Sequence, residues 1–478
     1  MSTTKTRRKQ PATASDTPYV GLIDIADGAV VVDDEANAGA RKGDLAAGAV
    51  HTLVSGRTGS GKSRSCLAPA AIMWGERPVV CVSSKGDLAE LTAPKRSRRG
   101  PAYLMDLSGE VRDAELRDAE VTRVASDPVA LIDSDDAALE MAALLLEVGS
   151  LGAGGGGAGG GGDSFWQSLA MRPLAAILRA AGTHFEFHDH EAVETAGGGI
   201  SWALAACEDV GDDDGPTEDL DPHADEDLSH PDWDNAYLRA ASVGSRHAQS
   251  LLSAKAMDPR QRDSIAINMR VALGAWALEA VAGDGSLPAF TPDMLEAKGA
   301  TLYVVSPLAG AAAPAASATL TGVVNHWRKR VGEVPAVLMV IDECPNTSPL
   351  PRLANWVGEA RGLNIRLLVA VQATSQFEPR WGAAGMKILR ETFPSILILP
   401  GAPEREILEL AAWAGGQEHV GSGSIDAAGR ASLGSERTER YSSSGLLPSR
   451  KGEGRLILSG RPGVRVYLPD IAATNLLD

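Results

Sequence analysis

Short apolar runs alternate with longer helical stretches in the first and last parts of the chain. Each run is bounded by Gly, Pro, Ser or Asp, which is typical of buried strands. Strands are predicted at 19–25, 29–34, 51–55, 78–84 and 102–107, and again at 301–306, 336–342, 365–373, 395–400, 454–460 and 463–469. The last two are close enough to form a hairpin. Strands that alternate with helices predict an α/β fold, a mostly parallel sheet flanked by helices.

Between residues 129 and 289 the strand-like runs give way to helical periodicity, clearest at 136–148, 164–182 and 263–283. This change predicts an all-α domain, 129–289, inserted into an α/β domain made of 19–128 and 290–478. Residues 1–18 are basic and polar without an apolar stretch, so we expect a disordered basic tail rather than a signal peptide.

Two low-complexity segments lie inside the predicted insertion. Residues 149–162 are almost all Gly and Ala, which predicts a flexible connector. Residues 208–234 contain 13 Asp or Glu and no Lys or Arg, which predicts a solvated acidic loop that could also bind a basic partner. Without that run the net charge of -17 becomes -17 + 13 = -4, so the acidity of the chain does not exclude a nucleic-acid partner.

Neither a membrane span nor a disulfide framework is predicted. The weakly apolar stretch 299–326 contains Pro307 and Pro314 and fits a strand followed by a helix better than a span. The four cysteines are far apart and include no C-x-x-C pair, which argues against a zinc site and fits a reducing cytoplasm.

The segment 54–65, VSGRTGSGKSRS, contains the pattern G-x-x-x-x-G-K-[ST] between a predicted strand and a predicted helix. In such a loop the backbone N–H groups surround phosphates, the lysine reaches the β- and γ-phosphates, and the hydroxyl after it binds magnesium. ATP and Mg²⁺ are therefore the expected cofactors. The predicted nucleotide-binding residues are Gly56, Thr58, Gly59, Ser60, Gly61, Lys62, Ser63 and Arg64.

Two acids, Asp342 and Glu343, follow the apolar strand predicted at 336–341. A carboxylate at the carboxyl end of a core strand lies beside the phosphate loop, so Asp342 is predicted to hold the magnesium shell together with Ser63. Glu343 is predicted to orient the attacking water, which favours a hydrolase over a transferase. Gln372, at the end of the strand predicted at 365–373, could sense the γ-phosphate.

These segments together resemble the type IV secretion coupling proteins, the TraG-type ATPases of conjugation in the FtsK–HerA superfamily. The resemblance extends over most of the chain from about residue 45. Beyond the phosphate loop it rests on SSKGDLAELT at 83–92, YLMDLSG at 103–109, DSFWQSLA at 163–170 and, as the most specific part, the acid motif, helix and glutamine strand at 342–382.

The resemblance implies a RecA-like P-loop NTPase core with an inserted all-α domain, acting as a peripheral motor at the cytoplasmic face of a membrane. It implies a homo-hexamer, or a monomer when DNA is absent. The implied cargo is single- or double-stranded DNA or a relaxase–DNA complex, which ATP hydrolysis would move into a type IV secretion channel. Lys62 and Ser63 inherit nucleotide and magnesium binding, Asp342 and Glu343 hydrolysis, and Gln372 the sensing role.

The chain departs from the family pattern in two ways. Coupling proteins commonly begin with membrane-spanning helices, and here only a short basic tail precedes the first predicted strand, so a separate membrane-anchor protein would recruit the chain or it would act in solution. The arginine that often follows the glycine of the helix after the acid motif is replaced by Glu359. Candidates for an arginine finger are Arg361, Arg366 and Arg405.

Two other functional hypotheses stay open. One is a related ring motor of the FtsK or HerA type that pumps DNA without a secretion channel. The other is a scaffold that binds nucleotide as a switch. The KGD segment and the helical insertion favour a coupling protein over the former, and the intact acid pair speaks against the latter.

The remaining clusters are weaker. The basic run PKRSRRG, 94–100, could contact DNA phosphates or lipid head groups, or be a solvated loop. The histidines of HFEFHDHE, 184–191, are read as a surface loop rather than a metal site because no further ligand set accompanies them.

Overall fold

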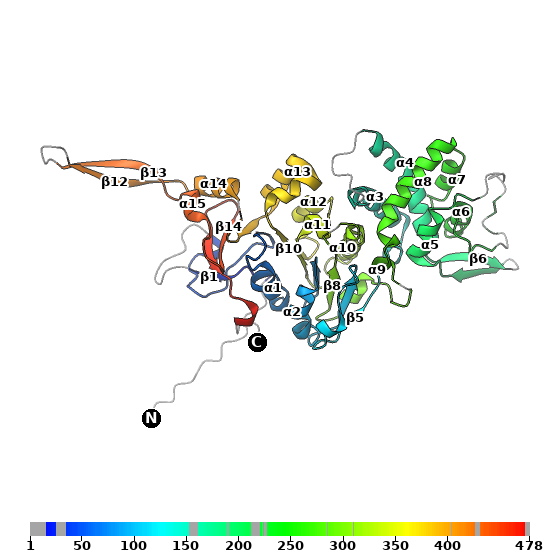
Figure 1. The fold of residues 1–478 in the computed structure, drawn as a ribbon, viewed down its shortest axis with the longest axis horizontal. Helices are drawn as coiled ribbons and strands as arrows, with labels where there is room; N and C mark the ends of the chain where they lie inside the picture. The colour runs from blue at the N-terminus through cyan, green and yellow to red at the C-terminus, as the bar shows by residue number, and fades with distance from the viewer. Residues whose placement is uncertain are drawn as a thin grey trace, which may run out of the picture.

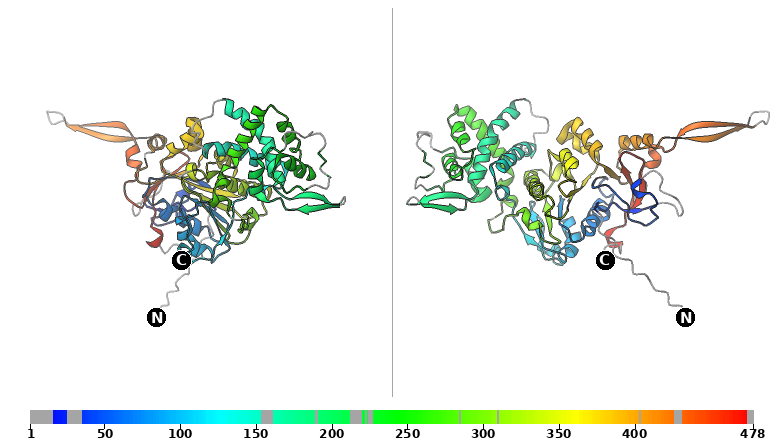
Figure 2. Two further views of the ribbon diagram at one scale, coloured as in Figure 1. Left: turned by 45° about the vertical axis from the view of Figure 1, so that its right-hand side comes forward. Right: turned by 180° about the vertical axis from the view of Figure 1, so that it is seen from behind.

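The computed structural model describes residues 16–24, 35–152, 161–188, 191–211, 220–221, 223, 227–283, 285–308, 310–402, 404–425 and 431–473. Most of the predicted tail, 1–18, and the strand predicted at 29–34 lie outside these residues. Figure 1 shows a central sheet with its helices, a helical region at one end of the long axis, and a projecting hairpin at the other end. The view from behind in Figure 2 shows the same arrangement.

The centre is a sheet that contains eleven strands within the described residues. Eight neighbouring strands are parallel, and three antiparallel strands extend the sheet at the β11 edge. In spatial order the strands are β1 (Leu22–Ile23), β15 (Val464–Tyr467), β14 (Glu453–Leu458), β11 (Ser395–Ile398), β2 (His51–Ser55), β10 (Ile365–Val371), β9 (Val337–Ile341), β3 (Val79–Ser83), β8 (Thr301–Val305), β4 (Ala102–Asp106) and β5 (Thr122–Arg123). The predicted hairpin at the end of the chain is β14–β15.

Register places the carboxyl ends of the central strands at one edge. Ser55 at the end of β2 pairs with Val371 of β10, and Ile341 at the end of β9 pairs with Val369 of β10 and with Val82 of β3. Residues that follow these strands therefore meet, however far apart they are in sequence.

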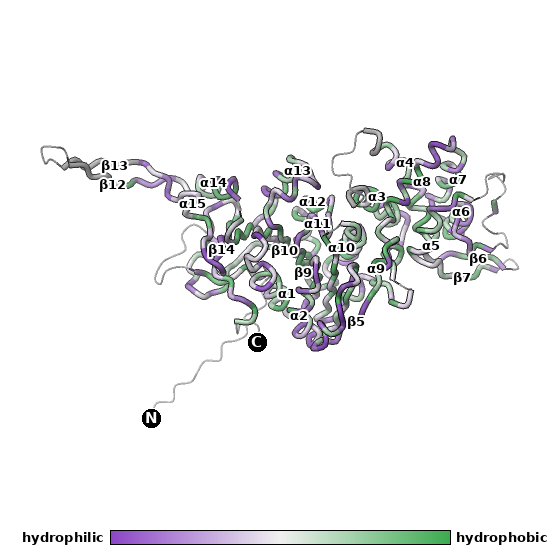
Figure 3. Tube along the Cα trace, in the orientation of Figure 1, coloured by the Kyte–Doolittle hydropathy of each residue, from purple (hydrophilic) through white to green (hydrophobic). Residues whose placement is uncertain are grey.

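The central strands are buried on both faces, which explains their uninterrupted apolar runs. Along β9 alternate residues enter two different cores: Val337, Met339 and Ile341 face one, and Leu338 and Val340 face the other. In Figure 3 hydrophobic segments, in green, gather where the central strands lie.

Helices from distant parts of the chain cover the two faces. The face of Leu338 is covered by α1 (Ala68–Met73) and α2 (Asp87–Arg96), with the one-turn π-helix η2 (Lys62–Leu67) before α1. The opposite face packs against α10 (Ala313–Lys329), α12 (Leu353–Glu359), α13 (Glu378–Thr392) and α14 (Arg405–Ala414). The shorter elements of the sheet region are η1 (Glu35–Asn37), η3 (Asp113–Glu115), η6 (Pro292–Leu295), α11 (Cys344–Thr347), η7 (Thr374–Phe377), α15 (Ser443–Leu446) and η8 (Ile471–Ala473).

The helical region shares a hydrophobic core with the second face of the sheet. Its longest helix, α4, packs against α3, α6 and α8. The elements of this region are η4 (Val129–Leu131), α3 (Asp135–Gly152), α4 (Gly161–Ala180), α5 (Gly199–Ala206), α6 (Trp233–Ser242), α7 (Gln249–Lys255), α8 (Pro259–Leu273), η5 (Gly274–Ala277) and α9 (Glu279–Ala282).

Two features of this region differ from the sequence predictions. The histidine segment is not a loop but the antiparallel hairpin β6 (His184–His188) and β7 (Glu191–Thr195), in which His184 is buried beside Glu186. The acidic loop predicted at 208–234 is wrong at its end, because α6 begins at Trp233, whose side chain is fully buried. Charge alone did not reveal the apolar anchor inside the acidic run.

The glycine-rich connector predicted at 149–162 is also shorter than expected. Helix α3 continues to Gly152 and α4 begins at Gly161, because neighbouring helical turns extend into the segment. Residues 153–160 lie outside the described residues.

A second hairpin, β12 (Gln417–Ile425) and β13 (Ala431–Glu439), projects from the end of the sheet (Figure 1). The sequence did not predict it, since its residues alternate too weakly between apolar and polar.

The predicted strand and helix at 299–326 are confirmed as β8 and α10. Within the part of the chain that the structure describes, no helix combines the length and the apolar character needed to span a bilayer.

The basic run 94–100 is partly structural. Arg96 is fully buried at the end of α2 and donates hydrogen bonds to the carbonyls of Arg77, Gly299 and Ala300 at 2.8, 3.0 and 3.1 Å. Arg99 donates to the carbonyl of Ile72. The expectation of a cationic loop is therefore wrong for Arg96, because main-chain carbonyls at the start of the neighbouring strands use its donors.

Candidate nucleotide-binding site

The phosphate loop connects β2 to η2 and has the backbone that its glycines allow. Gly59 and Gly61 lie at φ 81° and 95°, a region that other residues rarely adopt. Gly56 lies so close to β11 that a Cβ there would come within 2.9 Å of Leu399. The motif spacing therefore reflects real backbone requirements.

Lys62, the first residue of η2, is directed back across the loop. Its Nζ donates to the carbonyl of Gly56 at 2.5 Å and lies 3.3 Å from Glu343 Oε1. Both charged side chains are buried, so this contact is little screened by water. The lysine is thus held at the mouth of the loop by partners that a phosphate could replace.

Ser63 and Asp342 meet at the same edge. The Ser63 hydroxyl donates to Asp342 Oδ2 at 3.3 Å, while Asp342 Oδ1 is buried without a hydrogen-bond partner. Burial raises the pKa of Asp342 to about 7; Lys62 opposes the shift, and the neighbouring carboxylates of Glu343 and Asp87 add to it. A buried carboxylate beside two others, with an unpaired oxygen and an adjacent hydroxyl, fits a site for a hard divalent cation.

Glu343 directly follows Asp342 and has an unusual backbone. Its φ of 54° and ψ of 40° put it in the left-handed region, which costs a non-glycine residue about 1 kcal/mol or more. Its Oε2 is buried without a hydrogen-bond partner. This backbone conformation directs the Glu343 carboxylate so that Oε1 contacts Lys62, while Oε2 is available to another group.

Gln372 follows β10 at the same edge. Its main-chain N–H donates to Gln376 Oε1 at 2.8 Å, which fixes the start of the loop between β10 and η7. Together with the phosphate loop and the acid pair, Gln372 lines one cleft of about 590 Å³. The structure thus brings into contact residues that lie 279 and 281 positions apart in the chain, Ser63 with Asp342 and Lys62 with Glu343.

The structure places the predicted nucleotide-binding residues in or beside the cleft. Most of them line the cleft, namely Thr58, Gly59, Ser60, Gly61, Lys62, Ser63 and Arg64. Gly56 is not among the lining residues and contributes the carbonyl that holds Lys62. Arg64 forms a two-pronged ion pair with Asp470 at 2.8 Å, which holds the pKa of that carboxyl down at about 2.

The phosphate loop, the acid pair and Gln372 all lie within a part of the chain that matches a known protein family. Residues 23–404 match the family described as Type IV secretory system Conjugative DNA transfer. The chain belongs to this conjugative DNA transfer family. The resemblance inferred from the sequence is therefore confirmed.

Solved structures of family coupling proteins have the same fold. The bacterial conjugative coupling protein TrwBdeltaN70, in a trigonal form with sulphate, is 17% identical with a TM-score of 0.58, over 88% of this chain and 85% of that chain. The plasmid coupling protein TrwB in complex with ADP and Mg²⁺ is 17% identical with a TM-score of 0.57, over 89% and 87%. The predicted fold class, an α/β fold with a mostly parallel, RecA-type sheet flanked by helices, is confirmed. The inserted region is mainly helical, but the prediction that it is all-α is wrong because it contains the β6–β7 hairpin. No protein with curated annotation matches the chain.

Sequence reasoning missed several residues of the cleft in this family member. The KGD segment was quoted only as part of the resemblance, yet Lys85 and Asp87 line the cleft, and Asp87 begins α2 there. From the end of the chain come Lys451, Tyr467 and Asp470. No local pattern marks these last three, because only the antiparallel end of the sheet brings them to the cleft.

The candidate finger arginines do not join this cleft. Arg361 lies in the turn before β10, near His51 at the start of β2, and so at the opposite edge of the sheet from Gln372. Arg366 is buried and donates to Asp16 at 2.7 Å. Arg405 is exposed and pairs with Glu409 at 2.6 Å. None of the three lines the cleft of this chain.

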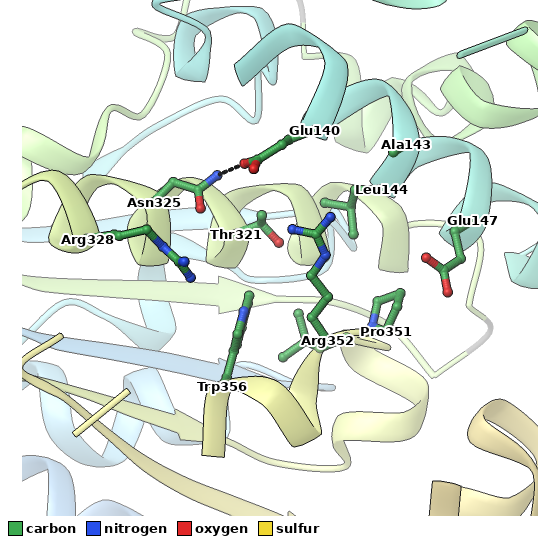
Figure 4. A pocket seen from close by; sticks show the side chains of 11 residues that line it. Glu140, Ala143, Leu144, Glu147, Thr321, Asn325, Arg328, Pro351, Arg352 and Trp356 are labelled. Carbon is green, nitrogen blue, oxygen red and sulfur yellow. Dashed lines mark hydrogen bonds between the residues drawn. The ribbon is translucent and has the colours of Figure 1, made fainter. Parts of the chain in front are cut away.

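A smaller cavity of about 40 Å³ lies between α3, α10 and α12 (Figure 4). Glu140 of α3 accepts a hydrogen bond from Asn325 of α10 at 3.2 Å across it. Glu147 of α3 lies on the same side, and burial raises its pKa while Arg352 opposes the shift. The cavity marks where the helical region meets the sheet region and contains no predicted site residue.

Proposed function

We propose that the chain is an ATP-hydrolysing motor that delivers DNA, or a relaxase–DNA complex, to a type IV secretion or conjugation channel. The observation that carries this proposal is the convergence of Lys62, Ser63, Asp342 and Glu343 on one cleft in a member of the conjugative DNA transfer family. The TrwB complex with ADP and Mg²⁺ supports the choice of cofactors, ATP and Mg²⁺.

In the proposed reaction the phosphate loop binds the triphosphate through its N–H groups, and Lys62 turns from Gly56 to the β- and γ-phosphates. Ser63 and Asp342 would hold the metal shell. Mg²⁺, when bound, supplies positive charge to the phosphate oxygens where negative charge develops. Glu343 orients the attacking water through the oxygen that has no protein partner.

The proposal extends to assembly. Gln372 would respond to loss of the γ-phosphate, and an arginine would come from a neighbouring subunit in a homo-hexamer, with monomers possible when DNA is absent. Arg361 lies at the opposite edge of the sheet from the cleft, so it could complete a site only in a neighbouring copy. We keep Arg361 as the proposed finger on that condition.

We propose the same division into domains that the sequence predicts. The RecA-like domain would be 19–128 with 290–478, the inserted domain would be 129–289, mainly helical with the β6–β7 hairpin, and the tail would be 1–18. We propose that the motor works at the cytoplasmic face of a membrane, where a channel or anchor protein recruits it.

Glu343→Gln tests the catalytic assignment. The amide keeps the size of the side chain but is a poor acceptor for a water proton, so ATP should still bind while turnover falls by about 100-fold or more. Binding of a fluorescent ATP analogue and steady-state phosphate release measure the two effects. Glu391→Gln, on the exposed side of α13, is the matched control and should not change turnover. Normal hydrolysis by the Glu343→Gln variant would show that another residue orients the water.

A further inference from the structure

A buried carboxylate, that of Glu404, lies next to the cleft without lining it. Glu404, at the start of α14, is only 3% exposed. Its Oε1 accepts hydrogen bonds from the Ser55 hydroxyl at 2.5 Å and from the Thr374 main-chain N–H at 2.7 Å, and its Oε2 accepts one from the Thr374 hydroxyl at 2.6 Å. Glu404 therefore joins the end of β2 to the loop after β10.

The hydroxyl of Thr374 also connects this carboxylate to a cation. Arg390 of α13 donates from Nε to Thr374 Oγ1 at 2.7 Å, and its other side pairs with Glu406 of α14. Thr374 Oγ1 thus accepts from a guanidinium and donates to a carboxylate, which a hydroxyl can do and a methyl group cannot. A buried carboxylate is costly without such partners, so the network demands one geometry.

Ser55 and Thr374, at the two ends of this hydrogen-bond network, lie near Gln372, the proposed γ-phosphate sensor. Ser55 immediately precedes Gly56 of the phosphate loop, and Gly56 N–H donates to the Val371 carbonyl at 3.1 Å. Thr374 lies two residues after Gln372. The segment that carries Gln372 is therefore held at one end by the β2–β10 ladder and at the other by Glu404.

We propose that Glu404 is a positioning residue, which acts through Thr374 to hold Gln372 against the phosphate loop and, with Arg390, ties that position to α13 and α14. This inference rests on the proposed function, because the position of Gln372 has a consequence only if the cleft distinguishes ATP from ADP. Glu404 itself does not line the cleft and needs no contact with nucleotide.

A pair of Thr374 variants isolates the network. Thr374→Val keeps the shape but removes the hydroxyl, and Thr374→Ser keeps the hydroxyl. We expect Thr374→Val to lower kcat by about tenfold or more with KM changed less than about threefold, and Thr374→Ser to stay within about twofold of the unmodified protein. Thr319→Val is the matched control, because the buried Thr319 hydroxyl bonds only within α10 and to Met105.

A second readout does not depend on hydrolysis. Dissociation constants for ADP and for a non-hydrolysable ATP analogue give a ratio that a correctly placed Gln372 sets. Thr374→Val and Glu404→Gln should change this ratio by about fivefold or more, while Thr374→Ser and Thr319→Val should not. The inference would be overturned if Thr374→Val changed neither the affinity ratio nor kcat. It would also be overturned if Thr319→Val changed them as much as Thr374→Val does.

These measurements distinguish an error in the role of Glu404 from an error in the proposed motor function. If the unmodified protein hydrolyses ATP and Thr374→Val behaves the same in both measurements, only the role of Glu404 is wrong. If the unmodified protein binds nucleotide without hydrolysing it under any condition, the motor function is wrong, and the affinity ratio alone decides the role of Glu404.

Discussion

At the scale of single residues, Glu343 combines a strained backbone with a proposed chemical role. Left-handed conformations of non-glycine residues persist only where the surroundings impose them, and they gather at functional sites. Here the side chain faces Lys62, and the residue is the N-cap that precedes α11. The sequence predicted the carboxylate and its place after β9, but not its conformation, since nothing local to an Asp-Glu pair requires a positive φ.

The strain itself can be measured with two variants. Glu343→Gly and Glu343→Ala both remove the carboxylate, but only glycine adopts φ 54° without cost. Glu343→Gly should therefore be more stable to urea than Glu343→Ala by about 1 kcal/mol, although glycine gives the unfolded chain more freedom. Equal stability, or a more stable alanine variant, would show that the left-handed conformation carries no such cost.

At the scale of elements, His51 links two central strands through its side chain. It begins β2, is fully buried, and its Nδ1 accepts a hydrogen bond from the Leu367 N–H of β10 at 3.2 Å. Burial lowers its pKa to about 4, and the charges of Arg366 and Arg361 add to the shift. The folded state therefore keeps this imidazole neutral where the unfolded chain would protonate it.

This shift predicts a loss of stability in acid. Below about pH 6.5 the unfolded state takes up a proton that the folded state does not, so the free energy of unfolding falls by up to about 1.4 kcal/mol per pH unit until about pH 4. His51→Asn keeps an acceptor near Leu367 but cannot titrate, and should make this slope shallower. Urea unfolding at several pH values measures it. The same slope in both proteins would mean that His51 does not titrate in this window.

The alternation of strands and helices explains how much could be predicted at this scale. Buried parallel strands such as β9 and β10 have continuous apolar runs, and parallel strands end at one edge, so the meeting of Asp342, Gln372 and the phosphate loop follows from sequence alone. The hairpin β12–β13 has no such run. Glu404 gave no signal either, because its role depends on Thr374, 30 residues away, and on Ser55, 349 residues away in the chain.

At the scale of the whole molecule, we propose that an arginine from a neighbouring copy completes the cleft of each chain. The phosphate loop, the acid pair and Gln372 come from one chain, whereas Arg361 lies at the opposite edge of the sheet. The parallel pairing of β2 with β10 places Arg361 there, near His51, and the residue pattern around Arg361 does not reveal it. A motor that needs an arginine from a neighbour would hydrolyse ATP slowly as a monomer and faster when DNA brings subunits together.

The most direct test of the motor is ATP hydrolysis measured during titration with single-stranded and double-stranded DNA, with the assembly state followed in the same samples. The account predicts that DNA raises turnover, that the rise shrinks with increasing salt as phosphate contacts lose their counterion-release contribution, and that Glu343→Gln abolishes it. Turnover that stays constant over a wide range of DNA lengths and salt concentrations would contradict it.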